Sequence, residues 1–213
     1  MKYNYGGHTA SIDGVYEIDG KSKLKVLDIT KGFWGEWLQS DVVFIDFPYD
    51  NRMIKHYYEQ IDQVTDLTYD KLQERAFEII ANISPKHVFV EVGKRNVHKV
   101  EAGLKEIGYE TYTHDSFYAK TSPCFIVEGC RPGDEPVNIP IAGIDELEAI
   151  ENICNELDFD CITDFFNGQG AVSRYAYAAG KRFVCSELNP NRAGKALYDL
   201  KKMGAKIEHR MND

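Results

Sequence analysis

No stretch of the 213-residue chain contains 18 consecutive apolar residues, so the sequence excludes a helix that spans a membrane. The first 14 residues also lack an apolar core, and we therefore expect no secretory leader. Apolar residues make up 43% of the chain and aromatic residues 12%, which excludes a disordered or low-complexity protein. The length fits one domain, residues 1–213, around one buried core.

The cysteines lack the spacing of a metal or redox site. None of the five belongs to a C-x-x-C pattern, and each flanks an apolar segment, as buried thiols do. We expect structural thiols in a cytoplasmic protein, and no metal site. The five residues are Cys124, Cys130, Cys154, Cys161 and Cys185.

Positive charge is scarce. The net charge of −9 argues against a protein that holds nucleic acid on a broad basic surface. No Lys or Arg occurs between Arg131 and Arg174, whereas ten acidic residues fall within 134–164. From residue 171 onwards, nine Lys and Arg residues outnumber four Asp and Glu residues. The chain therefore has an acidic segment, 134–164, followed by a basic end.

Continuous apolar runs alternate with segments of helical spacing along most of the chain. Such runs are typical of strands buried in a parallel sheet, and apolar residues three and four apart are typical of helices. This alternation predicts an α/β fold with a mostly parallel, seven-stranded sheet, one antiparallel hairpin and helices on both faces. Residues 1–22, rich in glycine and polar residues, are expected to form an extended arm or lid. Strands are expected at 23–29, 41–47, 87–92, 159–165 and 182–188, the hairpin at 109–114 and 124–130, and helices at 67–83, 96–108, 144–157, 171–180 and 191–204.

Paired glycines follow the predicted strand 159–165 in the stretch TDFFNGQG, residues 163–170. In an α/β sheet, ligands bind beyond the carboxyl ends of strands, where glycines let the backbone approach and a helix begins. An acid at the end of the next strand, Glu187, lies where it would bond ribose hydroxyls. Together these features favour a nucleoside-type cofactor. The alternatives are a plain tight turn, and a Glu187 that caps the helix after Asn189.

Two other nucleotide sites are disfavoured by what the turn lacks. The third glycine of the dinucleotide fingerprint is missing, since Arg174 stands near its position, and this argues against NAD(P). The chain also has no Gly-Lys-Ser/Thr phosphate loop, which argues against ATP.

A second motif, Asp46-Phe47-Pro48-Tyr49, follows the buried strand residues 41–45 and is expected at the same edge of the sheet. The Asp46 carboxylate and the Phe47 carbonyl could accept both hydrogens of an exocyclic base amine, whose lone pair would then point at a methyl donor. The ring of Tyr49 could stack on a flipped base. A plain type I turn is the alternative.

In this order, DFPY, DFFNGQG and SELNP resemble the motifs of amino-group DNA methyltransferases that use S-adenosylmethionine, over residues 23–204. Because the catalytic motif comes first, the resemblance implies the circularly permuted, Rossmann-like fold of the β class, with 23–130 as catalytic half and 131–213 as cofactor-binding half. An Asp in first position implies adenine N6 in DNA as the target. Phe47 and Phe165 depart from the family motifs, which carry proline there. The resemblance implies that Asp46, Phe47, Pro48 and Tyr49 are catalytic and that Asp164, Phe166, Gly168, Gly170, Glu187 and Asn189 bind the cofactor.

A recognition region of many tens of residues, usual in that family, is missing here. The residues between 93 and 159 are mostly used by the hairpin and the acidic helix. The best remaining candidate for substrate contact is the stretch 49–60, although an ordinary solvated loop or helix start is the alternative. Its stacking and phosphate-binding side chains are Arg52, Lys55, Tyr57 and Tyr58.

Other functions stay open at this point. The chain could be a catalytically weak or inactive cofactor-binding subunit, either a homodimer or one that docks a specificity partner on 134–164. The same chemistry could also act on RNA or on a protein amide. Residues 204–209 resemble the start of a strand that 23–29 would continue, and the sequence does not decide which of the two pairs in the sheet.

Overall fold

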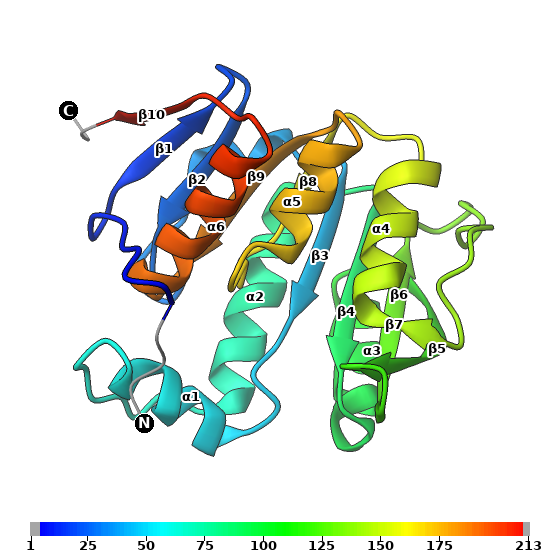
Figure 1. Ribbon diagram of the computed structural model, residues 1–213. Coiled ribbons are helices and arrows are strands. Elements are labelled where there is room, and N and C mark those ends of the chain that lie inside the picture. Colours follow the sequence, from blue (N-terminus) through cyan, green and yellow to red (C-terminus); the bar gives the residue numbers. More distant parts are fainter. Residues whose placement is uncertain (1–4, 211–213) are drawn as a thin grey trace.

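The computed structural model describes residues 5–210, which form one ten-stranded sheet in the order β10-β1-β2-β9-β8-β3-β4-β6-β5-β7 (Figure 1). The strands are β1 (Val15–Ile18), β2 (Ser22–Val26), β3 (Val42–Asp46), β4 (His87–Val92), β5 (Glu110–Tyr118), β6 (Ser122–Cys130), β7 (Ile144–Asp145), β8 (Cys161–Thr163), β9 (Arg182–Glu187) and β10 (Ile207–Arg210).

The middle of the sheet is parallel. β3 pairs with β4 on one side and β8 on the other, and β9 joins β8 to β2. β4 is buried at all six positions, because both of its faces are covered. Every carboxyl end of these strands therefore lies at one edge of the sheet.

Helices cover both faces of the sheet, as the sequence predicts. α4, α5 and α6 pack on one face, and α2 and α3 pack on the other (Figure 1). β3 shows the division, since Val42 and Phe44 point to the first layer and Val43 and Ile45 to the second. The helices are α1 (Asn51–Glu59), α2 (Tyr69–Ile83), α3 (Val97–Glu106), α4 (Glu146–Glu156), α5 (Ala171–Ala178) and α6 (Pro190–Lys202), with short 3₁₀ helices η1 (Gly35–Gln39) and η2 (Lys94–Asn96).

The number of strands corrects the sequence-based expectation of seven. The extra strands β1, β7 and β10 are two to four residues long, too short to show an apolar period. β1 and β2 make a second antiparallel hairpin beside the predicted one, β5–β6. All five cysteines are free and buried.

The open question about 23–29 and 204–209 has a clear answer, because both segments enter the sheet. β2 lies parallel to β9, in the inner position, and β10 pairs antiparallel with β1 at the edge. The boundary expected for the N-terminal arm, residue 22, is too late, because residues 15–18 already form β1. Residues 1–4 of that arm lie outside the described residues.

None of the helices formed by residues 5–210 combines the length and the apolar character needed to cross a membrane.

Candidate active site

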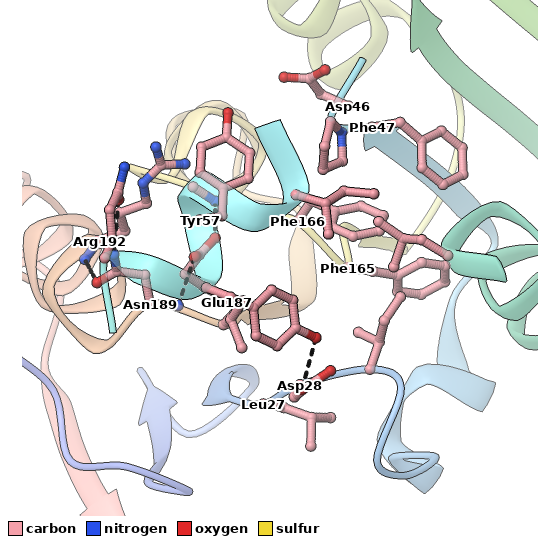
Figure 2. A pocket seen from close by; sticks show the side chains of 18 residues that line it. Leu27, Asp28, Asp46, Phe47, Tyr57, Phe165, Phe166, Glu187, Asn189 and Arg192 are labelled. Atoms are coloured by element: carbon pink, nitrogen blue, oxygen red, sulfur yellow. Dashed lines mark hydrogen bonds between the residues drawn. The ribbon is translucent and has the colours of Figure 1, made fainter. Parts of the chain in front are cut away.

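A pocket opens at the edge where β2, β3, β8 and β9 end (Figure 2). Its lining comes mainly from four strand ends, within 27–29, 46–48, 165–168 and 187–192, and from α1, which forms an outer wall, with Leu72 of α2. Figure 2 shows Tyr57 and Arg192 together on one side of the pocket. Segments far apart in the chain meet here because the carboxyl ends of parallel strands share one edge.

The DFPY motif begins at the last residue of β3. Asp46 is half-buried and lines the pocket together with Phe47 and Pro48. The ring of Phe47 is only 1% exposed and packs against Tyr69, Phe77 and Phe166, with ring centroids 5.4–6.2 Å apart. At this position, where the family motif has proline, packing of the ring in the core holds the turn in place.

The pKa of Asp46 is raised well above the usual range. Burial is the main cause, and the carboxylates of Glu91 and Asp164 add to it, while Arg192 opposes it. Glu91 is the register neighbour of Asp46 on β4. The pocket therefore holds a carboxylate that is a strong hydrogen-bond acceptor once ionised.

Tyr49 does not line this pocket but lies in a groove beside it. Its hydroxyl donates to Oε1 of the buried Glu91 at 2.5 Å, and its carbonyl accepts from Asn96 Nδ2 at 3.0 Å. Tyr118, in β5, meets its ring edge-on with centroids 6.4 Å apart. Both ends of Tyr49 are thus fixed, which leaves its ring in a set orientation.

The glycine turn after β8 is tied to the end of β9 by one carboxylate. Glu187 Oε2 accepts from the Gly168 amide at 2.7 Å, and its Oε1 accepts from the Asn189 amide at 2.8 Å. Glu187 does not cap α6, because Asn189 Oδ1 accepts from the amides of Asn191 and Arg192. Burial raises the pKa of Glu187, and the nearby Arg192 opposes this.

The two glycines of the turn differ in their surroundings. Gly168 has φ +54° and lines the pocket, and a Cβ there would meet only the Phe166 carbonyl, at 3.6 Å. Gly170 has φ +90°, and a Cβ there would lie 2.7 Å from Ala196 Cβ. Gly168 therefore leaves the pocket open, whereas Gly170 allows α5 to begin close to α6.

The predicted site residues fall into two sets. Those in the pocket are Asp46, Phe47, Pro48, Tyr57, Tyr58, Phe166, Gly168, Glu187 and Asn189. Outside it, Asp164 is buried and its Oδ1 accepts from the Phe166 amide at 2.8 Å, so it shapes the turn. Gly170 belongs to the helix contact, Tyr49 to the neighbouring groove, and Arg52 and Lys55 are exposed on α1.

Among the pocket residues that the sequence did not predict, two are charged. Asp28, just beyond β2, accepts from the Tyr58 hydroxyl at 2.9 Å. Arg192 lies in the first turn of α6, with its guanidinium 4.5 Å from the ring centre of Tyr57. The sequence carried a signal for Arg192, because a cation in the first turn of a helix interacts unfavourably with the helix dipole and so suggests a functional role.

The N-terminal segment, residues 5–14, packs along α6 and reaches the rim of the pocket. The backbone of Thr9 lies directly against Gly194, and the Ala10 amide donates to the Pro190 carbonyl at 2.8 Å. At its start, the hydroxyl of Tyr5 accepts from Arg192 Nε at 3.0 Å. This part of the predicted arm therefore stabilises a pocket residue.

Replacing Gly194 should detach this segment. A Cβ at Gly194 would lie 2.6 Å from backbone atoms of Thr9, closer than packed atoms come. In Gly194→Ala we expect faster hydrogen exchange and proteolysis within residues 5–14, with the sheet unchanged. Gly35→Ala is the control, because a Cβ there meets nothing within 4 Å. Equal exchange in both variants would contradict the packing described.

Among residues 5–210, no group of His, Cys, Asp and Glu side chains is arranged to hold a metal ion.

No protein-family model matches the sequence, and no curated protein sequence matches it. Solved structures do match. M1.HpyAVI has a TM-score of 0.58 at 14% identity, over 83% of this chain and 97% of that chain. TTHA0409 from Thermus thermophilus, a proposed DNA modification methylase solved with S-adenosyl-L-methionine, has a TM-score of 0.57 at 17% identity, over 82% and 89%.

The cytosine-N4-specific PvuII DNA methyltransferase is similar as well, with a TM-score of 0.58 at 10% identity, over 89% of this chain and 86% of that chain. At these identities the likeness is one of fold. The chain has the α/β fold of these proteins, and the predicted fold class is confirmed.

Proposed function

We propose that this protein is an S-adenosylmethionine-dependent methyltransferase that modifies an exocyclic amine of a nucleic-acid base, adenine N6 in DNA. The observation that carries the proposal is that Asp46, Phe47 and Pro48 line one pocket with Phe166, Gly168 and Glu187. Of the similar structures, TTHA0409 is a proposed DNA modification methylase and the PvuII protein is a DNA methyltransferase, and M1.HpyAVI and TTHA0409 have been solved with this cofactor.

The residues of the pocket fit this cofactor. Gly168 has no side chain to fill the space above the turn, and Phe166 supplies an apolar wall for a flat base. Each oxygen of Glu187 accepts one backbone amide, which leaves lone pairs of the carboxylate for ribose hydroxyls. When bound, the cofactor supplies an electrophilic methyl group on its sulfonium.

The reacting amine would be prepared by the DFPY turn. The lone pair of a base amine is delocalised into the ring, so the nitrogen is a poor nucleophile. Asp46 and the Phe47 carbonyl accept its two N–H hydrogens and favour a pyramidal nitrogen whose lone pair is free. Burial and neighbouring acids disfavour the charged form of Asp46, so hydrogen bonds from the amine would stabilise its carboxylate.

The base itself would stack on Tyr49. Glu91 and Asn96 hold that ring next to Asp46, so its orientation does not have to be established when the base arrives. A base inside a duplex cannot reach Asp46, and it has to be flipped out of the stack. An Asp in the first position of the motif favours adenine N6 over cytosine N4.

A second candidate function is a subunit that needs a specificity partner. Every strand within residues 5–210 belongs to the one sheet, and α2 to α6 pack on its faces, which supports this candidate because few residues are left over for a recognition region. Exposed acids on α4, which lies in the acidic segment 134–164, would dock a basic partner. Size-exclusion chromatography with light scattering tests the homodimer form, and robust activity of a monomer on naked DNA would exclude a partner requirement.

The proposed function is tested in two steps. Calorimetry with S-adenosylmethionine measures cofactor binding, and mass spectrometry of nucleosides from treated DNA and RNA identifies the product. We expect binding, and N6-methyladenine in DNA. Binding without any transfer would favour the partner-dependent subunit. Absence of binding would refute the methyltransferase.

The rate of methyl transfer should fall at low pH, because Asp46 has to be ionised to accept the amine hydrogens. Its raised pKa places that fall well above the usual titration of an aspartate. In Glu91→Gln a neighbouring negative charge is lost, so the pKa of Asp46 drops and the acid limb of the pH–rate profile moves to lower pH. The Gln oxygen still accepts from Tyr49.

The control for this shift is Glu148→Gln, the same change at an exposed position of α4. Single-turnover rates across the pH range are the measurement. If both variants kept the wild-type acid limb, ionisation of Asp46 would not limit the reaction.

A further inference from the structure

A second groove lies directly beside the DFPY turn. Residues 49–51, the start of α2 at 69–70, and residues 93–96 with Lys99 line it. Pro48 lines the main pocket and Tyr49 lines this groove, so the two hollows are neighbours along the chain. Whatever occupies the groove lies next to the occupant of the pocket.

The groove is tied firmly to Tyr49. Gly93 has no side chain, and a Cβ there would meet the Tyr49 ring at 3.9 Å. Asn96 donates to the Tyr49 carbonyl, and Asn51 accepts from the Tyr69 amide at 2.6 Å. A group bound in the groove would therefore have a defined position relative to the Tyr49 ring.

The sheet explains why positive charge is found here. β3 and β4 run parallel, with Asp46 beside Glu91, and the chain then continues into Gly93-Lys94-Arg95. Lys94 and Arg95 therefore come to the same edge as Asp46, on η2, between strand and helix. Neither residue belongs to the three motifs that resemble the methyltransferases.

The charges of Lys94 and Arg95 are not compensated. Both side chains are exposed, and within residues 5–210 neither forms an ion pair. Of the two acids of the groove, Asp50 keeps its charge but is held as the cap of α1, where it accepts from the Met53 amide at 2.8 Å. Asp70 pairs with Lys99 at 2.6 Å. Two free cations thus lie beside the site in a chain whose net charge is −9.

We infer that this groove holds the phosphate backbone of the nucleic acid next to the target base, with Lys94 and Arg95 as the phosphate contacts. The inference rests on the proposed function, since it requires a nucleic-acid substrate. An exposed guanidinium and an ammonium suit phosphodiester oxygens and carry no sequence information. They would position the strand while the target base stacks on Tyr49 and reaches Asp46.

The test is the double variant Lys94→Gln/Arg95→Gln, with binding of a short DNA duplex measured by fluorescence anisotropy over a series of salt concentrations. Each lost phosphate contact lowers the slope of log affinity against log salt by about 1, so we expect a decrease of about 2 and weaker binding at low salt. Affinity for S-adenosylmethionine should stay unchanged. Lys201→Gln/Lys202→Gln is the control, because it removes the same charge at the far end of α6.

The outcomes separate the two proposals. Wild-type binding with an unchanged slope in the double variant would overturn the phosphate groove and leave the methyltransferase standing. An equal loss of slope in the control variant would also overturn it, because the effect would then be one of net charge. A wild-type protein that binds the cofactor but no nucleic acid would overturn both the groove and the nucleic-acid substrate.

Discussion

Asp46→Asn should reduce methyl transfer to DNA by about 10²- to 10⁴-fold while leaving the affinity for S-adenosylmethionine nearly unchanged. The substitution removes the negative charge that the amine hydrogens would meet, and turns half of the acceptor into an NH₂ donor. The measurement is single-turnover transfer of a labelled methyl group, with calorimetry for the cofactor. An Asp46→Asn protein with the wild-type rate would remove this residue from the mechanism.

Loss of folding cannot mimic this result. A carboxyl whose pKa is raised by folding weakens the folded state at every pH where it is charged. Asparagine removes that cost, so thermal unfolding at neutral pH should show equal or greater stability than wild type. Asp66→Asn, an exposed residue in the loop before α2, is the matched control and should keep the wild-type rate.

Glu187→Gln should weaken S-adenosylmethionine binding by about 10- to 100-fold, because hydrogen bonds to a charged group contribute about 1.5–3 kcal/mol. Glu187 accepts one amide on each oxygen, and glutamine offers only one oxygen. Its NH₂ would face either the Gly168 or the Asn189 amide, both of which are donors. The turn would then leave the position in which, on the proposed function, it supports the ribose.

Calorimetry measures this loss, with Glu151→Gln on the exposed side of α4 as control. Affinity equal to wild type in Glu187→Gln would show that the cofactor does not depend on this carboxylate. The Asp46 and Glu187 variants should differ in kind. Asp46→Asn loses rate at full affinity, whereas Glu187→Gln loses affinity first.

The centre of the fold could be predicted from the sequence because strands that are buried on both faces consist of continuous apolar residues. Of the strands that end at the pocket, β3 shows this best, because residues 42–45 are a continuous and fully buried apolar run. Asn189 followed by Pro190 marked the start of α6, and Asn189 is its cap. These signals are local in the sequence. Because the strands were predicted to be parallel, the DFPY turn and the glycine turn, which both follow strands, were expected at one edge of the sheet.

Contacts between distant segments could not be predicted in this way. Arg192 stacks on Tyr57 and bonds Tyr5, and no periodicity links these three positions. Asp28 entered the pocket only because β2 took the place beside β9. The edge strand β10, half-buried at one position and exposed at three, carries no apolar pattern at all.

The departures from the family motifs have different consequences in space. Phe47 replaces a proline, and its buried ring holds the turn by packing. Phe165 is also buried, against Trp37, with ring centroids 5.0 Å apart. From the sequence alone, the loss of two prolines suggests turns that are less rigid. In the structure, packing of the two phenylalanine rings in the core keeps these turns in place.

While the chain leaves the ribosome, β2 and β3 are made early, yet β9 and β8 fill the places between them in the sheet. Until residues 161–187 emerge, β3 can pair only with β4, and its other edge stays open. An apolar strand with an open edge is prone to pair with other chains, so the unfinished chain is most exposed to aggregation at β3. The central sheet is complete only after β8 and β9, which are made late, have inserted between β2 and β3.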